Sequence, residues 1–213
     1  MSADFVDWPS IAADDFPFPQ AVPRARPADE LSVMLLSPDP AIRDDCAYTA
    51  AARWIGEGHL DDVLEALGDT TANRFIHPEI QARTFASLIL CCVLTRGHTA
   101  PGLLPKQAAE RWYAGFSAWY PVEQDTRGWD DSLGWLHAVA HGADSAAAFA
   151  KALPDRRTEL LDLCARRMTA APSDYRYAQL EDARLARALL LRAWPSPWFH
   201  DFCRWEAIDN CHR

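Results

Sequence analysis

Two histidines and two aspartates recur at helical spacing in the stretch GWDDSLGWLHAVAHGAD, which begins at Gly128. On a helix, Asp130, His137, His141 and Asp144 fall on one stripe, because steps of three, four and seven residues return to the same face. Imidazoles and carboxylates so placed can transfer protons, with His137 or His141 as acid or base and an aspartate orienting the ring. We therefore predict these four residues as candidate catalytic groups on a helix from Asp130 to about Ala152.

Part of the same stripe could instead hold a divalent metal ion. His137, His141 and Asp144 lie at i, i+4 and i+7, and paired histidines at this spacing bind zinc in helical sites. The glutamate that follows the first histidine in the zinc-protease motif HExxH is absent, since Ala138 stands there. A metal is thus a possible cofactor, but this pattern is not that protease motif.

Polar and aromatic residues just before and within this stretch are candidate ligand contacts. Arg127 could hold a carboxylate through two parallel hydrogen bonds, and that carboxylate could belong to the protein or to a ligand. We predict a small-molecule pocket whose further members are Glu123, Asp125, Arg127, Trp129 and Trp135.

The apolar surroundings of the stripe leave several interpretations open. A helix that is apolar over most of its circumference is buried, so its ionisable groups must be paired or hydrogen-bonded. The stripe could be a charge network that joins helices, a pocket without chemistry, or a catalytic or metal site. Gly134 and Gly142 are costly inside a helix and indicate the close approach of another backbone or of a ligand.

The rest of the chain has the pattern of an all-α protein. Apolar residues recur at three and four, and proline and glycine punctuate the segments. No apolar–polar alternation is long enough to predict a strand. The predicted helices cover residues 29–37, 40–56, 60–67, 78–96, 105–120, 131–152, 155–170, 176–193 and 197–209.

Five prolines interleaved with aromatic residues set residues 1–28 apart. Repeated proline opposes a helix, so we expect an extended N-terminal arm that either packs on the body or is disordered. Residues 29–213 are then expected to form a single helical domain, since 213 residues fit one domain.

A weak internal repeat favours a particular helical architecture. The segments that begin at Asp39 and His77 align with a spacing of 38, which pairs Pro40 with Pro78 and Ile42 with Ile80. Helix pairs of the HEAT and armadillo type recur at roughly 40–47 residues. We predict an irregular HEAT-like stack of antiparallel helix pairs, about eight or nine helices in all; a compact bundle is the alternative.

Composition limits the partners and the compartment. The net charge of −9 opposes nucleic acid and anionic membrane surfaces as partners. No apolar run reaches the roughly 20 residues that cross a bilayer, and we see no secretory signal, so a cytoplasmic location is expected. The six cysteines lie mostly on apolar faces and are expected to be reduced thiols. A zinc site among the C-terminal residues His200, Cys203, Cys211 and His212 is not expected, because their spacing is irregular.

Several motifs together resemble one bacterial family. They are Glu123-x-Asp-x-Arg-Gly and then Gly134-Trp-x-His-Ala-x-Ala-His-Gly-Ala-Asp144, with Ile42-Arg-Asp, Trp54-Ile and Arg83-Thr-Phe-Ala-Ser-Leu before them. This pattern is similar to the family named domain of unknown function 2785, over about residues 30–195. The resemblance implies a helical fold and brings no activity with it.

The sequence thus predicts a cytoplasmic helical protein that binds a small molecule or peptide in a His/Asp/Arg pocket and could be an acid–base or metal enzyme. The alternative is a non-catalytic scaffold or protein-interaction module in which the same residues only join helices. The oligomeric state does not follow from the sequence.

Overall fold

The computed structural model describes residues 6–170, 177 and 179–190, and this part of the chain is mostly helical. The predicted helix at 197–209 and the C-terminal histidines and cysteines lie outside the described residues. The α-helices are α1 (Trp8–Ala13), α2 (Ala25–Met34), α3 (Thr49–Gly56), α4 (Leu64–Ala72), α5 (Ile80–Thr99), α6 (Lys106–Trp119), α7 (Ala138–Ala152), α8 (Arg157–Thr169) and α9 (Glu181–Leu190). A π-helical segment, η1 (Ala41–Tyr48), runs directly into α3. The prediction of an all-α protein is confirmed.

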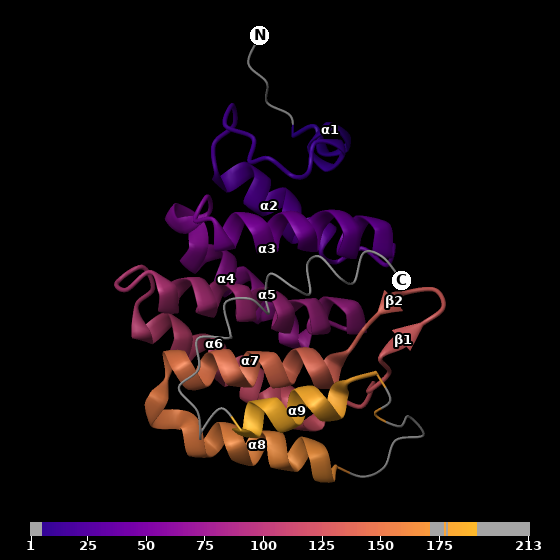
Figure 1. Cartoon of the computed structure of the whole chain (residues 1–213), viewed down its shortest axis with the longest axis vertical. Helices are drawn as coiled ribbons and strands as arrows, with labels where there is room; N and C mark the ends of the chain where they lie inside the picture. Colours follow the sequence, from indigo (N-terminus) through magenta and orange to yellow (C-terminus); the bar gives the residue numbers. More distant parts are fainter. Residues whose placement is uncertain (1–5, 171–176, 178, 191–213) are drawn as a thin grey trace.

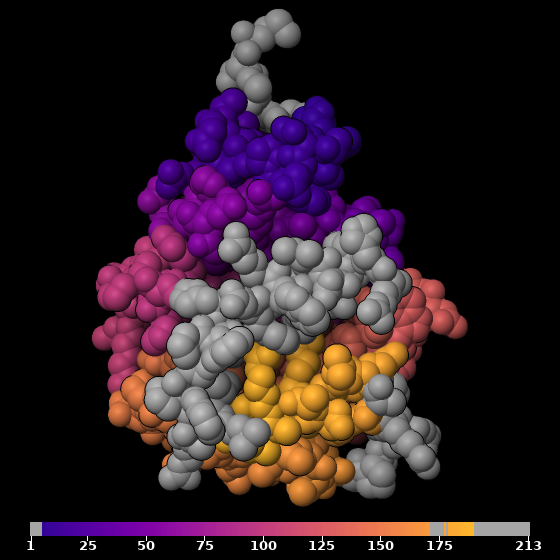
Figure 2. Space-filling model, in the orientation of Figure 1, coloured from indigo at the N-terminus to yellow at the C-terminus, as the bar shows by residue number. Residues whose placement is uncertain are grey.

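The helices lie across the long axis of the molecule in layers that broadly follow the order of the chain. Figure 1 shows α1 and α2 at one end, α4 and α5 in the middle, and α7, α8 and α9 at the other end. The colour bands of the space-filling view follow the same order (Figure 2). Neighbouring layers therefore bury their apolar faces against one another, as amphipathic helices must.

Helices α5 and α7 form the centre of the core. Both are buried over most of their length. Small residues let them approach closely: the Ser87 hydroxyl donates to the carbonyl of His141 at 3.0 Å and lies 2.8 Å from the Ser145 hydroxyl oxygen. Gly142 of α7 faces the ring of Tyr120, which fills the space that a Cβ would occupy. The close approach predicted at Gly142 is therefore made by an aromatic ring.

The N-terminal segment contains a helix that the prolines were expected to prevent. Helix α1 starts at Trp8, with Pro9 in the first turn, where a missing N–H costs nothing. The segment packs on the body. The ring of Trp8 stacks on that of Trp54 with 5.7 Å between the ring centroids, and Phe18 meets the Trp54 ring edge-on with 5.1 Å between centroids. Helix α2 begins at Ala25, four residues before the predicted start.

The largest error of the sequence prediction concerns residues 128–137, which form a β-hairpin and not helix. Strand β1 (Trp129–Asp130) pairs with the antiparallel strand β2 (Gly134–Trp135). Asp130 accepts hydrogen bonds from the amides of Ser132 and Leu133, which competes with a helix. Gly134 has φ +70, and a Cβ there would lie 3.0 Å from Pro40. Two-residue strands are too short to show apolar alternation, so the prediction that the chain has no strand was wrong here.

The two segments that align in the sequence share one hydrogen-bonding pattern, at a spacing that differs from the predicted one. Arg43 and Arg83 each donate through Nη1 to the carbonyls six and five residues earlier in the chain, so the two segments correspond at a spacing of 40, not 38. Burial agrees, because Ile42 is 42% exposed whereas Ile80 is 8% exposed. The segment η1 is π-helical whereas α5 is α-helical, so equally spaced apolar residues do not share the same face in the two segments.

Cys46 and Cys164 are free thiols, as expected for reduced cysteines. Cys91 and Cys164 are buried, and Cys46 and Cys92 are partly buried. Among the described helices, none is long and apolar enough to span a bilayer.

Candidate functional site

The candidate site lies at the N-terminal end of α7, between the β-hairpin, α5 and α9. His137 is the N-cap residue of α7 and has left-handed backbone angles, φ 47 and ψ 37. Its ring stacks on Trp135 at 4.6 Å, nearly parallel, and Trp135 in turn meets Trp129 edge-on at 4.8 Å. The hairpin thus places His137 against α7 with a backbone conformation that non-glycine residues seldom adopt.

His141 lies one turn further along α7, and its imidazole is held neutral. The ring lies 5.6 Å from that of His137 and meets Phe85 of α5 edge-on at 6.0 Å. Burial lowers its pKa well below the usual 6.5, and the nearby cations Arg184 and Arg43 and the His137 ring act in the same direction. A polar contact with the Thr84 backbone opposes this shift and is weaker. At neutral pH, His141 is therefore a neutral hydrogen-bonding group and not an acid.

Asp144 does not face the imidazoles as a free carboxylate. Its Oδ2 accepts hydrogen bonds from Nε of Arg184, at 2.8 Å, and from Nη2 of the same residue, while Arg187 Nη2 lies 3.8 Å from Oδ1. Both partners of the short pair are buried. Asp144 therefore ties α7 to α9, and this buried ion pair neutralises its charge.

The two imidazoles share one feature. The Nδ1 atoms of His137 and His141 are both buried and have no hydrogen-bond partner among the described residues. The nearest acidic group is Glu181 at the start of α9, whose Oε1 lies 3.4 Å from His137 Nδ1 without hydrogen-bond geometry. Buried polar atoms in native proteins are nearly always partnered, so two such atoms on adjacent rings need an explanation.

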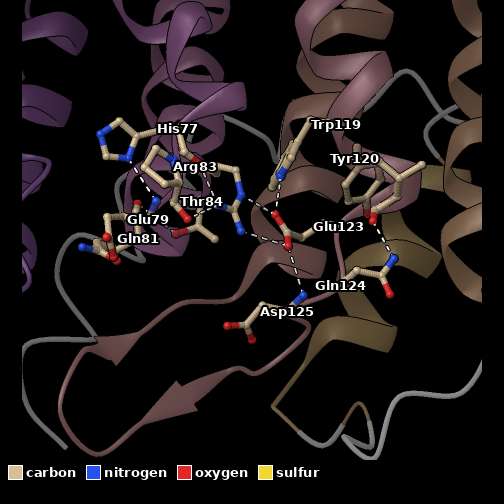
Figure 3. Close-up of polar contacts among 12 residues, drawn as sticks. His77, Glu79, Gln81, Arg83, Thr84, Trp119, Tyr120, Glu123, Gln124 and Asp125 are labelled. Carbon is tan, nitrogen blue, oxygen red and sulfur yellow. Dashed lines mark hydrogen bonds and ion pairs between the residues drawn. The ribbon is translucent and has the colours of Figure 1, made fainter.

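Glu123 belongs to a separate network that fastens α5 to the segment after α6. Figure 3 shows its carboxylate between Arg83, Trp119 and Asp125. It accepts from Arg83 Nε at 2.6 Å, from Trp119 Nε1 at 2.6 Å and from the Asp125 amide at 3.0 Å. Burial alone would raise its pKa, but these hydrogen bonds outweigh burial and lower it. This carboxylate has a structural role whether or not it meets a ligand.

Arg127 joins Asp125 and Asp130 within the hairpin region. Its Nη2 lies 2.6 Å from Asp125 Oδ2, and Nη1 donates to Asp130. Hydrogen bonds from Ser132 lower the pKa of Asp130 to about 2. The predicted carboxylate clamp is thus made with the protein's own acids. Asp130 lies on the hairpin and not on α7, so the predicted stripe is reduced to His141 and Asp144 on the helix with His137 at its start.

The predicted metal site does not match the geometry of its residues. Among the residues that the structure describes, no three His, Cys, Asp or Glu side chains are grouped so that they could hold an ion. Asp144 is already paired with Arg184, and His137 adjoins Glu181 on the other side.

Sequence reasoning missed the contribution of α9. Glu181 and Arg184 approach the α7 face, although they are 40 or more residues from it in the sequence. Arg43 was also missed: it is fully buried, lies 4.7 Å above the Phe85 ring and donates to the Leu133 carbonyl. No local spacing links these residues to His141, so only the tertiary fold could reveal them.

One groove on the described part of the chain lies away from the imidazoles. It has a volume of about 440 Å³ and is lined by α6 and α8, with Tyr113, Arg156 and Glu159 in its wall. These groups bind one another: Arg156 Nη1 donates to Glu159 at 2.7 Å, and the Tyr113 hydroxyl donates to the same carboxylate at 3.1 Å.

Fold and site together define an all-α protein with a buried imidazole pair at one edge of its helical core. A family model described as "Protein of unknown function (DUF2785)" matches residues 76–193, and the chain belongs to this family. The match covers α5 to α9 and all the candidate site residues, whereas Arg43 and the segments before residue 76 lie outside it. Neither the curated proteins nor the solved structures contain a match.

The buried, neutral state of His141 predicts a pH dependence of stability. Because the pKa of His141 is lowered in the folded protein, the unfolded chain binds the proton first as the pH falls below about 6.5. The contribution of the neutral His141 ring to stability is therefore fully present above about pH 6.5, and it is lost as the pH falls below that value. When the pH is lowered from about 7.5 to about 5.5, the free energy of unfolding of wild type, measured in urea, should fall by roughly 1 kcal/mol more than that of His141→Gln. Equal decreases in the two proteins would contradict the lowered pKa of His141.

The left-handed conformation of His137 predicts a second effect. Asparagine tolerates such angles, but a β-branched residue does not. His137→Val should therefore lower the free energy of unfolding by about 2 kcal/mol more than His137→Asn does. The control is His98→Val at an exposed helix end, which should change little. Equal stability of His137→Val and His137→Asn would show that this backbone conformation is not adopted in solution.

Proposed function

We propose that this chain is a small-molecule-binding helical protein whose ligand site is the N-terminal end of α7. The observation that carries the proposal is the pair of buried, unpartnered Nδ1 atoms of His137 and His141. Leaving each such atom unpaired costs about 1–3 kcal/mol, a cost that a bound ligand would remove. The strained backbone at His137 also supports it, because such strain concentrates at functional sites.

The ligand chemistry we propose is hydrogen bonding, with acid–base catalysis as an extension. His141 is buried and neutral, so one imidazole nitrogen is available to accept a proton or a hydrogen bond from a ligand. Trp135, stacked on His137, supplies an aromatic surface beside it. We further propose that Arg127 and Glu123 position the hairpin and α5 around the site.

A second candidate function has its own support. The three groups that donate to Glu123, and the pairing of Asp144 with Arg184, join helices without any ligand. These contacts favour a scaffold for protein interactions, in which the predicted site residues only lock successive layers. The spacing of 40 between Arg43 and Arg83 supports a HEAT-like stack, which we propose as the architecture under either function. A cytoplasmic location in a bacterium completes the proposal.

A thermal-shift panel separates the two functions. Wild type, His141→Phe and the exposed control His98→Phe would be screened against sugars, amino acids, nucleosides, carboxylic acids and phosphate esters. Binding at the imidazoles predicts compounds that raise the Tm of wild type and of the control but not of His141→Phe. If no compound distinguishes His141→Phe from the other two proteins, the ligand-binding proposal fails and the scaffold is favoured.

A further inference from the structure

The first turn of α7 presents backbone donors without acceptors. Ala138, Val139 and Ala140 are 2%, 1% and 0% exposed. Within the described part of the chain, their amides donate to no acceptor, and the first amide with a partner is that of His141, which bonds the His137 carbonyl at 2.9 Å. Helix ends that are buried are normally capped, and the His137 side chain makes no cap hydrogen bond here.

This geometry is suited to a negatively charged group. A left-handed residue followed by a helical one directs successive N–H groups into a common concavity, which binds anions. The helix dipole adds a partial positive charge at the same end. The amide of His137 itself already bonds the Gly128 carbonyl at 3.3 Å, so the amides of residues 138–140 and the helix dipole are what this end offers to an anion.

The imidazoles provide an independent indication that a ligand belongs there. Side chains on a helix lean toward its N-terminus, so the ring of His141 extends back over the first turn of α7. Its centroid lies 5.6 Å from that of His137, the N-cap residue. The unpartnered Nδ1 atoms of both rings are therefore at the same helix end as the free amides.

The charges around this end do not favour a cationic ligand. Asp144 and Arg184 neutralise one another. Glu181 is an acidic neighbour, with Oε1 3.4 Å from His137 Nδ1, and it opposes an anion. Against it stand the three free amides and the helix dipole; the buried guanidinium of Arg43, which helps to depress the pKa of His141, is itself paired with Asp44 at 2.7 Å.

We propose that the first turn of α7 binds an oxyanion group, a carboxylate or a phosphate, of a small molecule. The inference rests on the proposed function and names the class of its ligand. The backbone amides of residues 138–140 hold the oxyanion, and the imidazoles of His137 and His141 bind neighbouring polar groups of the same molecule.

Backbone amide NMR of the full chain tests this directly. Inorganic phosphate, acetate and, as a neutral control, glycerol would be titrated into separate samples. We expect saturable shifts at the amides of residues 138–141 with phosphate or acetate and none with glycerol. The start of α6, at the exposed residues Lys106 and Gln107, also has no side-chain cap, so it serves as the internal control for weak binding at any helix end.

Two variants sharpen the test. His141→Phe replaces the imidazole with an aromatic ring that has no nitrogens, and it should raise the Kd for the oxyanion at least about tenfold. Glu181→Gln removes the opposing charge and should strengthen binding, a result that a merely structural role would not give. If one variant fails to fold, the other is sufficient for the test.

The inference is overturned if phosphate and acetate leave the amide signals of residues 138–141 unchanged, or shift them no more than the signals at the start of α6. If the panel nevertheless finds a neutral ligand that depends on His141, only the oxyanion fails and the proposed function stands.

Discussion

Gly142→Ala is expected to lower the free energy of unfolding by about 3 kcal/mol, at the upper end of the usual cost of overpacking. The added Cβ would lie 2.0 Å from Cε2 and 2.2 Å from Cδ2 of Tyr120. The Tyr120 ring cannot move away easily, because it is fully buried and its hydroxyl donates to the Val139 carbonyl at 2.8 Å. Urea unfolding followed by circular dichroism measures the loss.

Gly56→Ala is the matched control for this substitution. Gly56 is the last residue of α3, and a Cβ there would meet nothing within 4 Å. Alanine should stabilise this position by up to about 1 kcal/mol, because glycine is the poorer helix former. The opposite signs of the two substitutions test the packing of Tyr120 against α7; a neutral Gly142→Ala would show that this packing is wrong.

Asp144→Ala is expected to cost about 3–5 kcal/mol, since it leaves the buried guanidinium of Arg184 without its carboxylate. The double variant Asp144→Leu with Arg184→Met removes both charges and should recover much of that stability. An exposed pair provides the control: Asp155→Ala breaks the bond from Lys106 and should change stability by less than about 1 kcal/mol.

A double-mutant cycle in chemical denaturation would measure the coupling between Asp144 and Arg184. Strong coupling assigns Asp144 to the joint between α7 and α9. A small loss in Asp144→Ala, together with lost ligand binding, would instead return Asp144 to the set of ligand contacts that its sequence position first predicted.

Most of the fold could be predicted from the sequence, because helical periodicity is a local property. The segment at 78–96 became α5, and the segment at 105–120 became α6, with small differences at their ends. The predicted helix boundaries were wrong where side chains compete with the backbone for hydrogen bonds. Asp130 binds the amides that a helix would need, and Gly134 adopts a left-handed turn, so an apparently helical stretch forms a hairpin.

The candidate site could be predicted only in part. His137 and His141 are neighbours as predicted, because one helical turn separates them. The partners of Asp144 could not be predicted, since Arg184 comes from α9, 40 residues later. The free amides at the start of α7 were equally hidden, because they follow from the place where the helix begins, and the sequence placed that start several residues too early.

The most direct test of the account is the ¹⁵N spectrum of the histidine side chains, recorded with and without a small-molecule extract of bacterial cells. We predict that the extract shifts the Nδ1 signals of His137 and His141. Two signals should stay unchanged: that of exposed His98 and that of His77, whose Nδ1 already accepts from the Glu79 amide at 3.1 Å. Unchanged signals at His137 and His141, or shifts confined to His98, would contradict a ligand site at the start of α7.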